Sequence, residues 1–346
     1  MTEFQVTNQN SGNTFQVRAD ETVLDSLLRQ GTAVPYSCRN GTCAACKATL
    51  VSGRVIYDEY DPSALTNEEI ANGAILLCRA HPREDLEICA EEIDLLSNLV
   101  IQKLPCRVME LNRLAHDVME VKLALPRETT FQFIAGQYID IMMRDDKRRG
   151  FSIANAPGSD LLTLHVRHVP KGRFTSHIFQ AMKIRDILRL EGPLGTFFLR
   201  KDTDKPIIMI AGGTGFAPLH SILEDVFRGA ENTRPIHLFW GVRALRDLYH
   251  RDLVERWVEE HKGVFQFTAV LSEPEVTSNW RGETGWVHES VLRHYSDLSN
   301  FEVYASGPPP MIEVIRDTFP EHGLLPAQLY YDSFEFSSDT LYSAES

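Results

Sequence analysis

The sequence has few cysteines, no long apolar run and fewer basic than acidic residues, and each shortage excludes a class of protein. Six cysteines in 346 residues, most of them in one motif, do not make a disulfide framework. The longest apolar stretch, Pro206 to Pro218, is interrupted by three glycines and is too short to span a bilayer. A formal net charge of −13 disfavours nucleic acid as a partner. The N-terminus shows no basic-then-apolar signal, so we expect a soluble cytoplasmic protein that does not bind membranes.

The bulk composition predicts a globular chain of two or three domains. Hydrophobic residues make up 43% of the chain and charged residues 24%, with no internal repeat or low-complexity tract. Residues 1–100 carry 7 Lys and Arg against 15 Asp and Glu, a net charge of −8. Such an acidic segment can steer the protein toward a basic patch on a partner, or it can serve solubility alone. The sequence leaves both interpretations open.

Four of the six cysteines follow a spacing that is typical of an iron–sulfur cluster. Cys38, Cys43 and Cys46 are spaced Cys-x4-Cys-x2-Cys, and Cys78 follows 32 positions later. This is the plant-type spacing for a [2Fe–2S] cluster held by four thiolates. Zinc sites favour two short cysteine pairs, so the cluster is preferred over zinc and over unrelated buried thiols. The remaining two cysteines are interpreted as ordinary buried thiols: Cys89 and Cys106.

The pattern changes twice along the rest of the chain, which predicts further domains. Residues 1–95 form the first domain, and residues 96–103 look like a linker. Residues 104–200 carry short strands separated by Gly, Pro and Asp turns, which predicts an antiparallel barrel. Residues 205–336 alternate strands with helices, which predicts a parallel sheet. Residues 337–346 are interpreted as a polar tail.

A glycine-rich turn joins the first strand of that sheet, Pro206–Ala211, to a helix that runs to about Arg228. Glycines permit a close approach of the backbone to a dinucleotide, and a helix N-terminus favours the negative charge of its phosphates. The residues that we expect to bind the nucleotide here are Gly212, Gly213, Thr214 and Gly215.

Together these motifs resemble the ferredoxin–NADP reductase superfamily, in particular its iron–sulfur flavoprotein reductases with an N-terminal ferredoxin domain. Arg149-Gly-Phe-Ser152 resembles the family's Arg-x-Tyr-Ser flavin motif, and Gly192-Pro-Leu-Gly195 resembles the turn that ends its flavin domain. The resemblance covers essentially the whole chain and implies a multidomain α+β and α/β fold. Its parts are a β-grasp ferredoxin domain, an antiparallel β-barrel flavin domain and a Rossmann-like parallel-sheet nucleotide domain.

The resemblance also implies roles for residues of the barrel. Arg149 is expected to pair with the flavin pyrophosphate, Phe151 to pack along the flavin, and the Ser152 hydroxyl to face flavin N5. Phe151 replaces the usual Tyr, which keeps the stacking but removes a phenolic hydrogen bond. Further cofactor contacts in this domain implied by the resemblance are Gly150, His165, Val166, Arg167, Gly172, Arg173, Phe174 and Thr175.

On the nucleotide side, Ser306 stands where many relatives have Cys beside the nicotinamide. Phe334 is the candidate for the aromatic that shields the flavin, with Phe336 second; Ser152, Ser306 and Phe334 are thus the predicted catalytic residues. Glu273 takes the place of the Arg with which NADPH-using relatives hold the 2′-phosphate, so NADH is favoured over NADPH. The other nucleotide contacts implied by the resemblance are Arg243, Gly307 and Pro308.

The function implied by the resemblance is that of a monomeric reductase that passes electrons from NADH to FAD, to the [2Fe–2S] cluster and then to a partner protein. FAD rather than FMN rests on the resemblance alone. The partner is left open between an oxygenase component and a pyridoxamine-phosphate (PMP) or iron–sulfur sugar dehydrase. The alternatives are a stand-alone NAD(P)H-flavin or ferric reductase and an electron carrier with a degenerate reductase half. The intact Gly212 loop, Arg149 and Ser152 disfavour the last of these.

Overall fold

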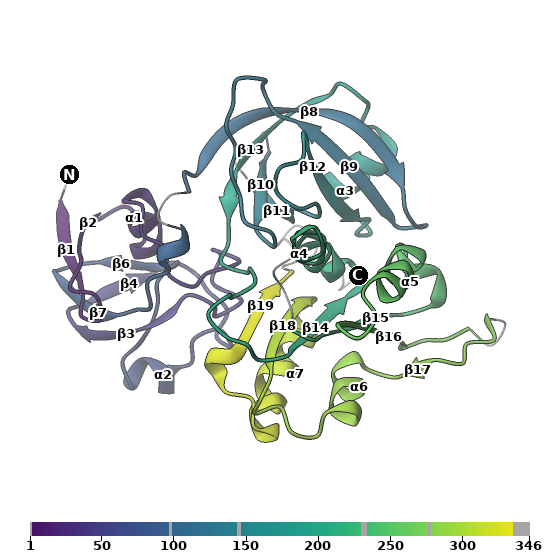
Figure 1. Cartoon of the computed structure of the whole chain (residues 1–346). Coiled ribbons are helices and arrows are strands. Elements are labelled where there is room, and N and C mark those ends of the chain that lie inside the picture. Colours follow the sequence, from purple (N-terminus) through teal and green to yellow (C-terminus); the bar gives the residue numbers. More distant parts are fainter. Residues whose placement is uncertain (1, 97–98, 144–146, 230–233, 276–277, 335–346) are drawn as a thin grey trace. The chain divides into compact units, whose positions relative to one another are not determined.

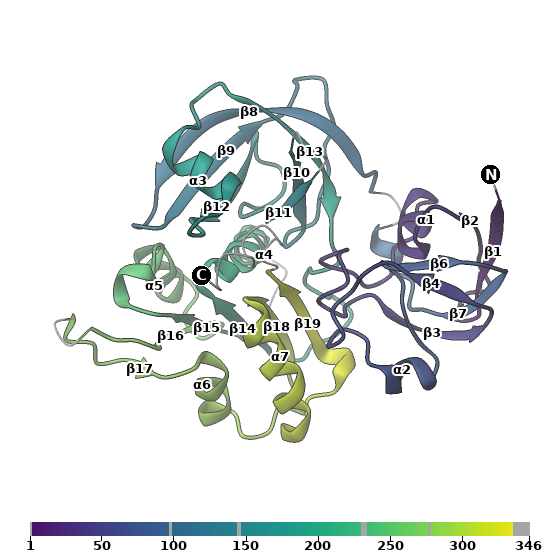
Figure 2. The ribbon, with the colours of Figure 1, turned by 180° about the vertical axis from the view of Figure 1, so that it is seen from behind.

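The computed structural model describes residues 2–96, 99–143, 147–229, 234–275 and 278–334, and these fall into two compact units (Figures 1 and 2). Unit 1 comprises Met1–Ile101 with the short segment Pro193–Thr196, and unit 2 comprises the rest. The expected polar tail and Phe336 lie outside the described residues. The domain limits expected from the sequence stay a prediction.

Unit 1 is built on a five-stranded mixed sheet with the strand order β2-β1-β7-β3-β5, in which β1 and β7 run parallel. A second sheet pairs β4 with β6. The sequence predicts a helix near residues 22–30 with Val23, Leu24, Leu27 and Leu28 on one apolar face. The helix α1 buries the first three of these and leaves Leu28 half-buried, and Thr22 caps its start by accepting the Asp25 N–H. The elements of unit 1 are β1 (Glu3–Asn8), β2 (Thr14–Arg18), α1 (Val23–Arg29), β3 (Lys47–Ser52), β4 (Val55–Tyr57), α2 (Asn67–Ala71), β5 (Ala74–Leu76), β6 (Ala80–Pro82) and β7 (Leu86–Cys89).

The first half of unit 2 is a six-stranded antiparallel sheet with the order β11-β10-β13-β8-β9-β12. A bridge between Ile153 and Leu164 joins its two outer strands, so the sheet closes into the predicted barrel. Alternate residues of the strands fill the interior, among them Ile139, Leu164 and Leu190. The elements are β8 (Gln102–Arg113), β9 (Val118–Ala124), β10 (Tyr138–Met142), β11 (Arg148–Ser152), β12 (Leu161–Arg167), α3 (Arg173–Gln180) and β13 (Ile187–Leu194).

The second half of unit 2 is a parallel sheet with the order β17-β16-β15-β14-β18-β19, as the strand–helix alternation predicts. Helices α4 and α5 cover one face, and α6 and α7 cover the other (Figure 1). The elements are β14 (Ile207–Gly212), α4 (Phe216–Arg228), β15 (Ile236–Val242), α5 (Arg251–Glu260), β16 (Phe265–Leu271), β17 (Glu283–Thr284), α6 (Val287–His294), β18 (Glu302–Gly307), α7 (Pro309–Thr318) and β19 (Leu329–Ser333).

One helix starts later than the sequence suggests. The residues Asp247-Leu-Tyr249 follow a strand and predict the opening of a helix, but α5 begins at Arg251. The Asp247 carboxylate accepts the N–H of Ala244, and this bond closes a short 3-10 turn over Leu245–Asp247 instead. None of the described helices combines the length and the apolar character that crossing a membrane requires.

A buried ion pair fastens the edge of β18 to the loop before β15. Arg234 donates to Glu302 at 2.5 Å, and the two side chains are only 8% and 4% exposed. The same guanidinium donates to the carbonyls of Lys205 and Arg200, and the Tyr304 hydroxyl donates to Glu302. The pair is therefore fully hydrogen-bonded, which is the condition under which a buried pair is tolerated.

We predict that Arg234→Met lowers the free energy of unfolding of unit 2 by about 3–5 kcal/mol, because it leaves the Glu302 carboxylate buried without its partner. The matched control is Arg251→Met, which removes an exposed pair with Glu255 and should cost less than about 0.5 kcal/mol. All four tryptophans belong to unit 2, so denaturant unfolding followed by tryptophan fluorescence measures this unit. Equal losses in the two variants would contradict the prediction.

Candidate functional site

The four predicted cluster cysteines lie together in unit 1 as two pairs. The backbone N–H of Cys43 points at the Cys38 sulfur (3.4 Å), and the pKa of Cys38 lies well below its ordinary value because the Cys43 thiol also donates to that sulfur. A hydrogen bond with Cys46 raises the pKa of Cys78, which also senses the charge on Cys38. Two thiols for each of two metals is the ligand set of a [2Fe–2S] cluster.

The backbone of the thiol loop is shaped to enclose this group. Arg39 and Ala44 adopt the left-handed conformation (φ 58° and 63°), which is uncommon for residues with a side chain. At Gly41 an added Cβ would lie 2.7 Å from Tyr60 and 2.8 Å from Arg79, so only glycine fits there. The N–H of Ala45 points at the Cys43 sulfur (3.5 Å), as the expected N–H contacts to sulfur require. The residues present therefore fit a [2Fe–2S] cluster.

The glycine-rich turn follows β14, which lies beside β18 in the sheet. From β14 the chain continues to β15 on one side, and β18 continues to β19 on the other side, so the strand order reverses between them. Parallel sheets bind their ligands at such a reversal. Gly213–Gly215 form a 3-10 turn directly before α4. A Cβ on Gly215 would lie 1.9 Å from the Ser306 carbonyl oxygen, and one on Gly212 would lie 2.7 Å from Pro308. The turn after β14 and the turn after β18 thus pack against each other at backbone distance.

Ser306, whose carbonyl takes part in this contact, has a hydroxyl without a hydrogen-bond partner among the described residues. Its side chain is completely buried, and its Oγ makes no hydrogen bond to any residue that the structure describes. A buried hydroxyl without a hydrogen-bond partner costs free energy. A bound nucleotide that supplied this partner would remove the cost, so the hydroxyl fits a nucleotide site at this strand end. Phe334 follows β19 and donates its N–H to the Gly307 carbonyl (2.8 Å), which places the Phe334 backbone beside the residue that follows Ser306.

Ser152, at the end of the barrel strand β11, meets the parallel sheet through Asp332. The Ser152 hydroxyl donates to the Asp332 carboxylate (3.3 Å), and both residues are buried. Asp332 in turn lies opposite Ser306 in the β18–β19 register. Asp332 was missed in the sequence, although the segment Tyr330–Phe334 that contains it was singled out. The sequence feature that could have indicated it is a carboxylate among the aromatic residues at the end of this strand.

Helix α4 fastens the flavin motif to the glycine turn. His220 Nδ1 lies 2.6 Å from the Ala154 carbonyl, Ser221 donates to the Asn155 carbonyl (2.7 Å), and Glu224 accepts the Ala156 N–H (2.9 Å). Residues 154–156 directly follow Ser152 and Ile153. The two motifs that the sequence separates by 60 residues are therefore held by three successive hydrogen bonds.

The other predicted flavin contacts are placed as follows. The Phe151 ring packs on Phe174 from α3, with ring centroids 5.7 Å apart. Gly172 is the N-cap of α3 and provides no side-chain cap, and an added Cβ there would lie 2.7 Å from the Thr175 hydroxyl. Arg149 and Gly150 lie on β11, and Arg173 is the first residue of α3.

Val166 and His165, two of the expected cofactor contacts, have side chains that are enclosed by other residues, and their assignment stays a prediction. Val166 points into the barrel interior, so its side chain is not available to a flavin. The His165 ring is enclosed by the rings of His220, Tyr249 and His250. Both assignments came from the position of their strand in the family, which does not say which way a side chain points.

Asp117 brings two of the predicted arginines together. Its carboxylate accepts Arg167 Nε (2.9 Å) and Arg243 Nη2 (3.3 Å). The Arg167 guanidinium lies beside Gly213, because an added Cβ there would be 2.9 Å from Nη1. Two cations beside the glycine turn fit the phosphates of a dinucleotide. Asp117 was also missed, since an Asp in a strand connection reads as an ordinary turn residue.

Glu273 follows β16 and is exposed, while its N–H is bonded to the Arg243 carbonyl (2.8 Å). The loop after β16 is thereby tied to the loop after β15, next to the paired arginines. A carboxylate in this place fits the expected rejection of a 2′-phosphate.

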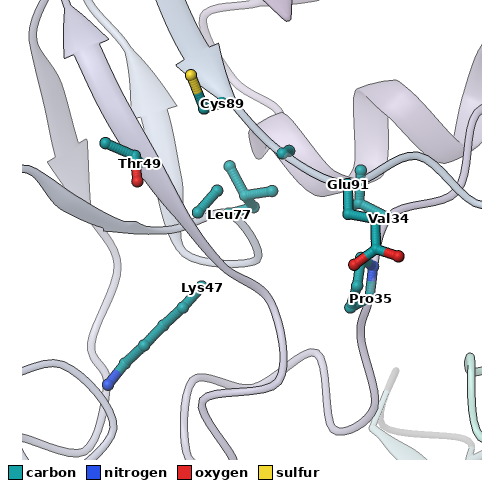
Figure 3. A pocket seen from close by; sticks show the side chains of 9 residues that line it. Val34, Pro35, Lys47, Thr49, Leu77, Cys89 and Glu91 are labelled. Carbon is teal, nitrogen blue, oxygen red and sulfur yellow. The ribbon is translucent and has the colours of Figure 1, made fainter. Parts of the chain in front are cut away.

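Unit 1 also has an open groove of about 340 Å³ lined by nine residues (Figure 3). Cys89 contributes to its wall and is half-buried, not buried as expected, whereas Cys106 is buried in the barrel. Lys47 and Leu77, also in the wall, each neighbour a cluster cysteine in the chain. None of the predicted cofactor ligands lines the groove, so it lies outside the candidate site.

Comparison with known protein families shows three domains in the order seen here. Residues 6–83 match the 2Fe-2S iron-sulfur cluster binding domain, residues 105–199 the oxidoreductase FAD-binding domain, and residues 209–317 the oxidoreductase NAD-binding domain. The fold and the site therefore define an NAD(P)H-dependent iron–sulfur flavoprotein oxidoreductase. The chain belongs to the family of reductases that combine these three domains in one polypeptide.

Individual relatives agree over nearly their whole length. The chain is 39% identical to the CDP-6-deoxy-L-threo-D-glycero-4-hexulose-3-dehydrase reductase of Yersinia pestis, covering 94% of this chain and 96% of that protein. It is 32% identical to the terephthalate 1,2-dioxygenase reductase component 2 of a Comamonas species, covering 95% and 97%. Among solved structures, the Amycolatopsis cytochrome P450 reductase GcoB has a TM-score of 0.80 at 30% identity, covering 96% and 98%.

We predict that Cys43→Ser abolishes the cluster, because one of the two metals loses half of its thiolates. The purified variant should retain less than about a tenth of the roughly two irons per chain expected for the cluster. The matched control is Cys89→Ser, which changes a thiol outside the paired set and should keep its iron. Iron analysis and visible absorption measure both variants, and a Cys43→Ser protein with full iron would exclude this thiol as a ligand.

Proposed function

We propose that the chain oxidises NADH and delivers the electrons one at a time, by way of FAD and the [2Fe–2S] cluster, to a separate acceptor protein. The carrying observation is the set of four paired thiols in a chain whose other unit joins Ser152, Asp332 and Ser306 at one strand end. NADH gives two electrons together as hydride, a flavin can take two and release them singly, and the cluster carries one. A stand-alone flavin reductase would not need the thiol loop.

The residue roles of the proposal follow from their places. Ser152, Ser306 and Phe334 would orient the nicotinamide and flavin rings, with Asp332 holding the Ser152 hydroxyl. Arg149 and the start of α3 would hold the FAD phosphates. The glycine turn would hold those of the nucleotide, together with the Asp117-bound pair of Arg167 and Arg243.

The acceptor is the least defined part of the proposal. Relatives named as reductases of a sugar dehydrase are 39% identical, and those named for oxygenases are 32–34% identical. We favour a dehydrase-type acceptor on this difference, with an oxygenase component second. We further propose that the protein works as a monomer in the cytoplasm, where NADH is regenerated.

Anaerobic titration with NADH tests the whole route. We expect bleaching of the flavin absorption together with a rhombic electron paramagnetic resonance signal from a reduced [2Fe–2S] cluster. Flavin bleaching with no cluster signal, in a protein whose iron content is complete, would contradict the route and favour a flavin reductase. The Cys43→Ser protein is the control, since it should still bleach with NADH.

The nucleotide preference is tested at Glu273. We predict that Glu273→Arg shifts the ratio of kcat/KM for NADPH over NADH upward by about tenfold, the change that about 1.4 kcal/mol of charge interaction produces. The matched control is Glu275→Arg, which reverses the charge of an exposed carboxylate two residues away that pairs with Arg246. Ferricyanide reduction measures both ratios. An equal shift of this ratio in the two variants would show that Glu273 has no specific effect on the choice of nucleotide.

A further inference from the structure

A buried cluster of histidines lies inside unit 2, and one of them, His165, is also an expected cofactor contact. His165 belongs to the barrel strand β12, His220 to α4, and His250 directly precedes α5. The ring centroids are 5.1 Å apart for His165 and His250, 5.4 Å for His165 and His220, and 5.5 Å for His220 and His250. Three imidazoles from three elements thus meet at one point of the fold.

Glu120 adds a carboxylate to this point. It lies on β9 directly opposite His165 in the β9–β12 register. One carboxylate oxygen of Glu120 and one ring nitrogen each of His165 and His250 all lie within 4.8 Å of one another. Tetrahedral zinc with bonds of about 2.0–2.1 Å holds neighbouring donor atoms about 3.3 Å apart, so modest side-chain rotations close the set.

The donors are in the state that a metal requires. Burial lowers the pKa of both His165 and His250, which favours the neutral rings that bind metals. The His165 Nδ1 lies 3.3 Å from the Tyr249 hydroxyl. Asn112 donates to the Glu120 carboxylate (2.8 Å). Such outer contacts orient ligands in metal sites.

The position also offers a path for entry. Glu120 and His250 are half-buried, whereas His165 is buried, so the set opens from its outer donors toward solvent. A charged neighbour on the barrel side is Lys122, whose Nζ lies 3.7 Å from Glu120 Oε2, the oxygen that also accepts from Asn112, and 2.8 Å from Glu110. Its ammonium is thus held mainly by another carboxylate.

We propose that Glu120, His165 and His250 form a binding site for a zinc ion, with the fourth position open to water. Two imidazoles and one carboxylate are a ligand set that zinc takes in proteins. The ion would bridge β9 and β12 of the barrel to the start of α5. This proposal does not depend on the proposed electron route.

The test uses the full chain with its cluster and flavin bound, freed of loosely held metal by a chelator. Zinc is added at micromolar free concentration, and zinc and iron per chain are counted together by mass spectrometry. We expect one zinc with the full iron content retained. The zinc X-ray absorption spectrum should then show nitrogen and oxygen neighbours at about 2.0–2.1 Å and no sulfur at about 2.3 Å.

Variants assign the ligands. His250→Asn and Glu120→Gln should each weaken zinc binding by at least about tenfold, measured by competition with a coloured chelator. The matched control is His261→Asn, which changes a histidine stacked on Phe227 in the same unit and should leave the affinity unchanged. No zinc on the wild-type chain, sulfur neighbours in its spectrum, or unchanged affinity in both ligand variants would overturn the proposal.

Discussion

The close approach of two strand ends in the parallel sheet is the constraint on which the candidate site depends. Gly215 lies so near the Ser306 carbonyl that any side chain there would overlap it. Because α4 begins one residue later, this contact also fixes where that helix starts and which way it runs. The absence of a Cβ atom at Gly215 therefore determines the position of the glycine turn and the position of the helix together.

Helix α4 transmits this constraint to the barrel. His220, Ser221 and Glu224 occupy neighbouring positions on one face of the helix, and each bonds a backbone group of residues 154–156. Buried backbone groups must find partners, so this irregular segment depends on the helix for its conformation. Ser152 lies at its start and reaches Asp332 across the same boundary. The flavin motif and the nucleotide turn consequently behave as one piece of structure.

What the sequence could predict depends on how far apart the interacting residues are. The cluster cysteines and the turn at Gly212 could be predicted because each motif depends on a few residues that lie close together in the sequence. The Ser152–Asp332 bond joins residues 180 positions apart, and no local pattern marks it. His165 was predicted as a cofactor contact, but its packing on His220 and His250 was not, because a strand pattern shows that residues alternate and not which side chains they meet. The strand and helix order followed from periodicity, whereas the late start of α5 depended on a side chain that caps a turn.

The conformation of the thiol loop has a consequence for the lifetime of the protein. Arg39 and Ala44 sit in left-handed conformations that cost about 1–2 kcal/mol each, and metal–thiolate bonds supply the free energy that holds such a loop. Loss of the iron would remove those bonds, whereas the hydrogen bonds of the unit 1 sheet do not depend on them. The loop would then be the first segment to open, and exposed loops are where proteases cut. Protease sensitivity of this loop would therefore distinguish a chain without its cluster from one that carries it.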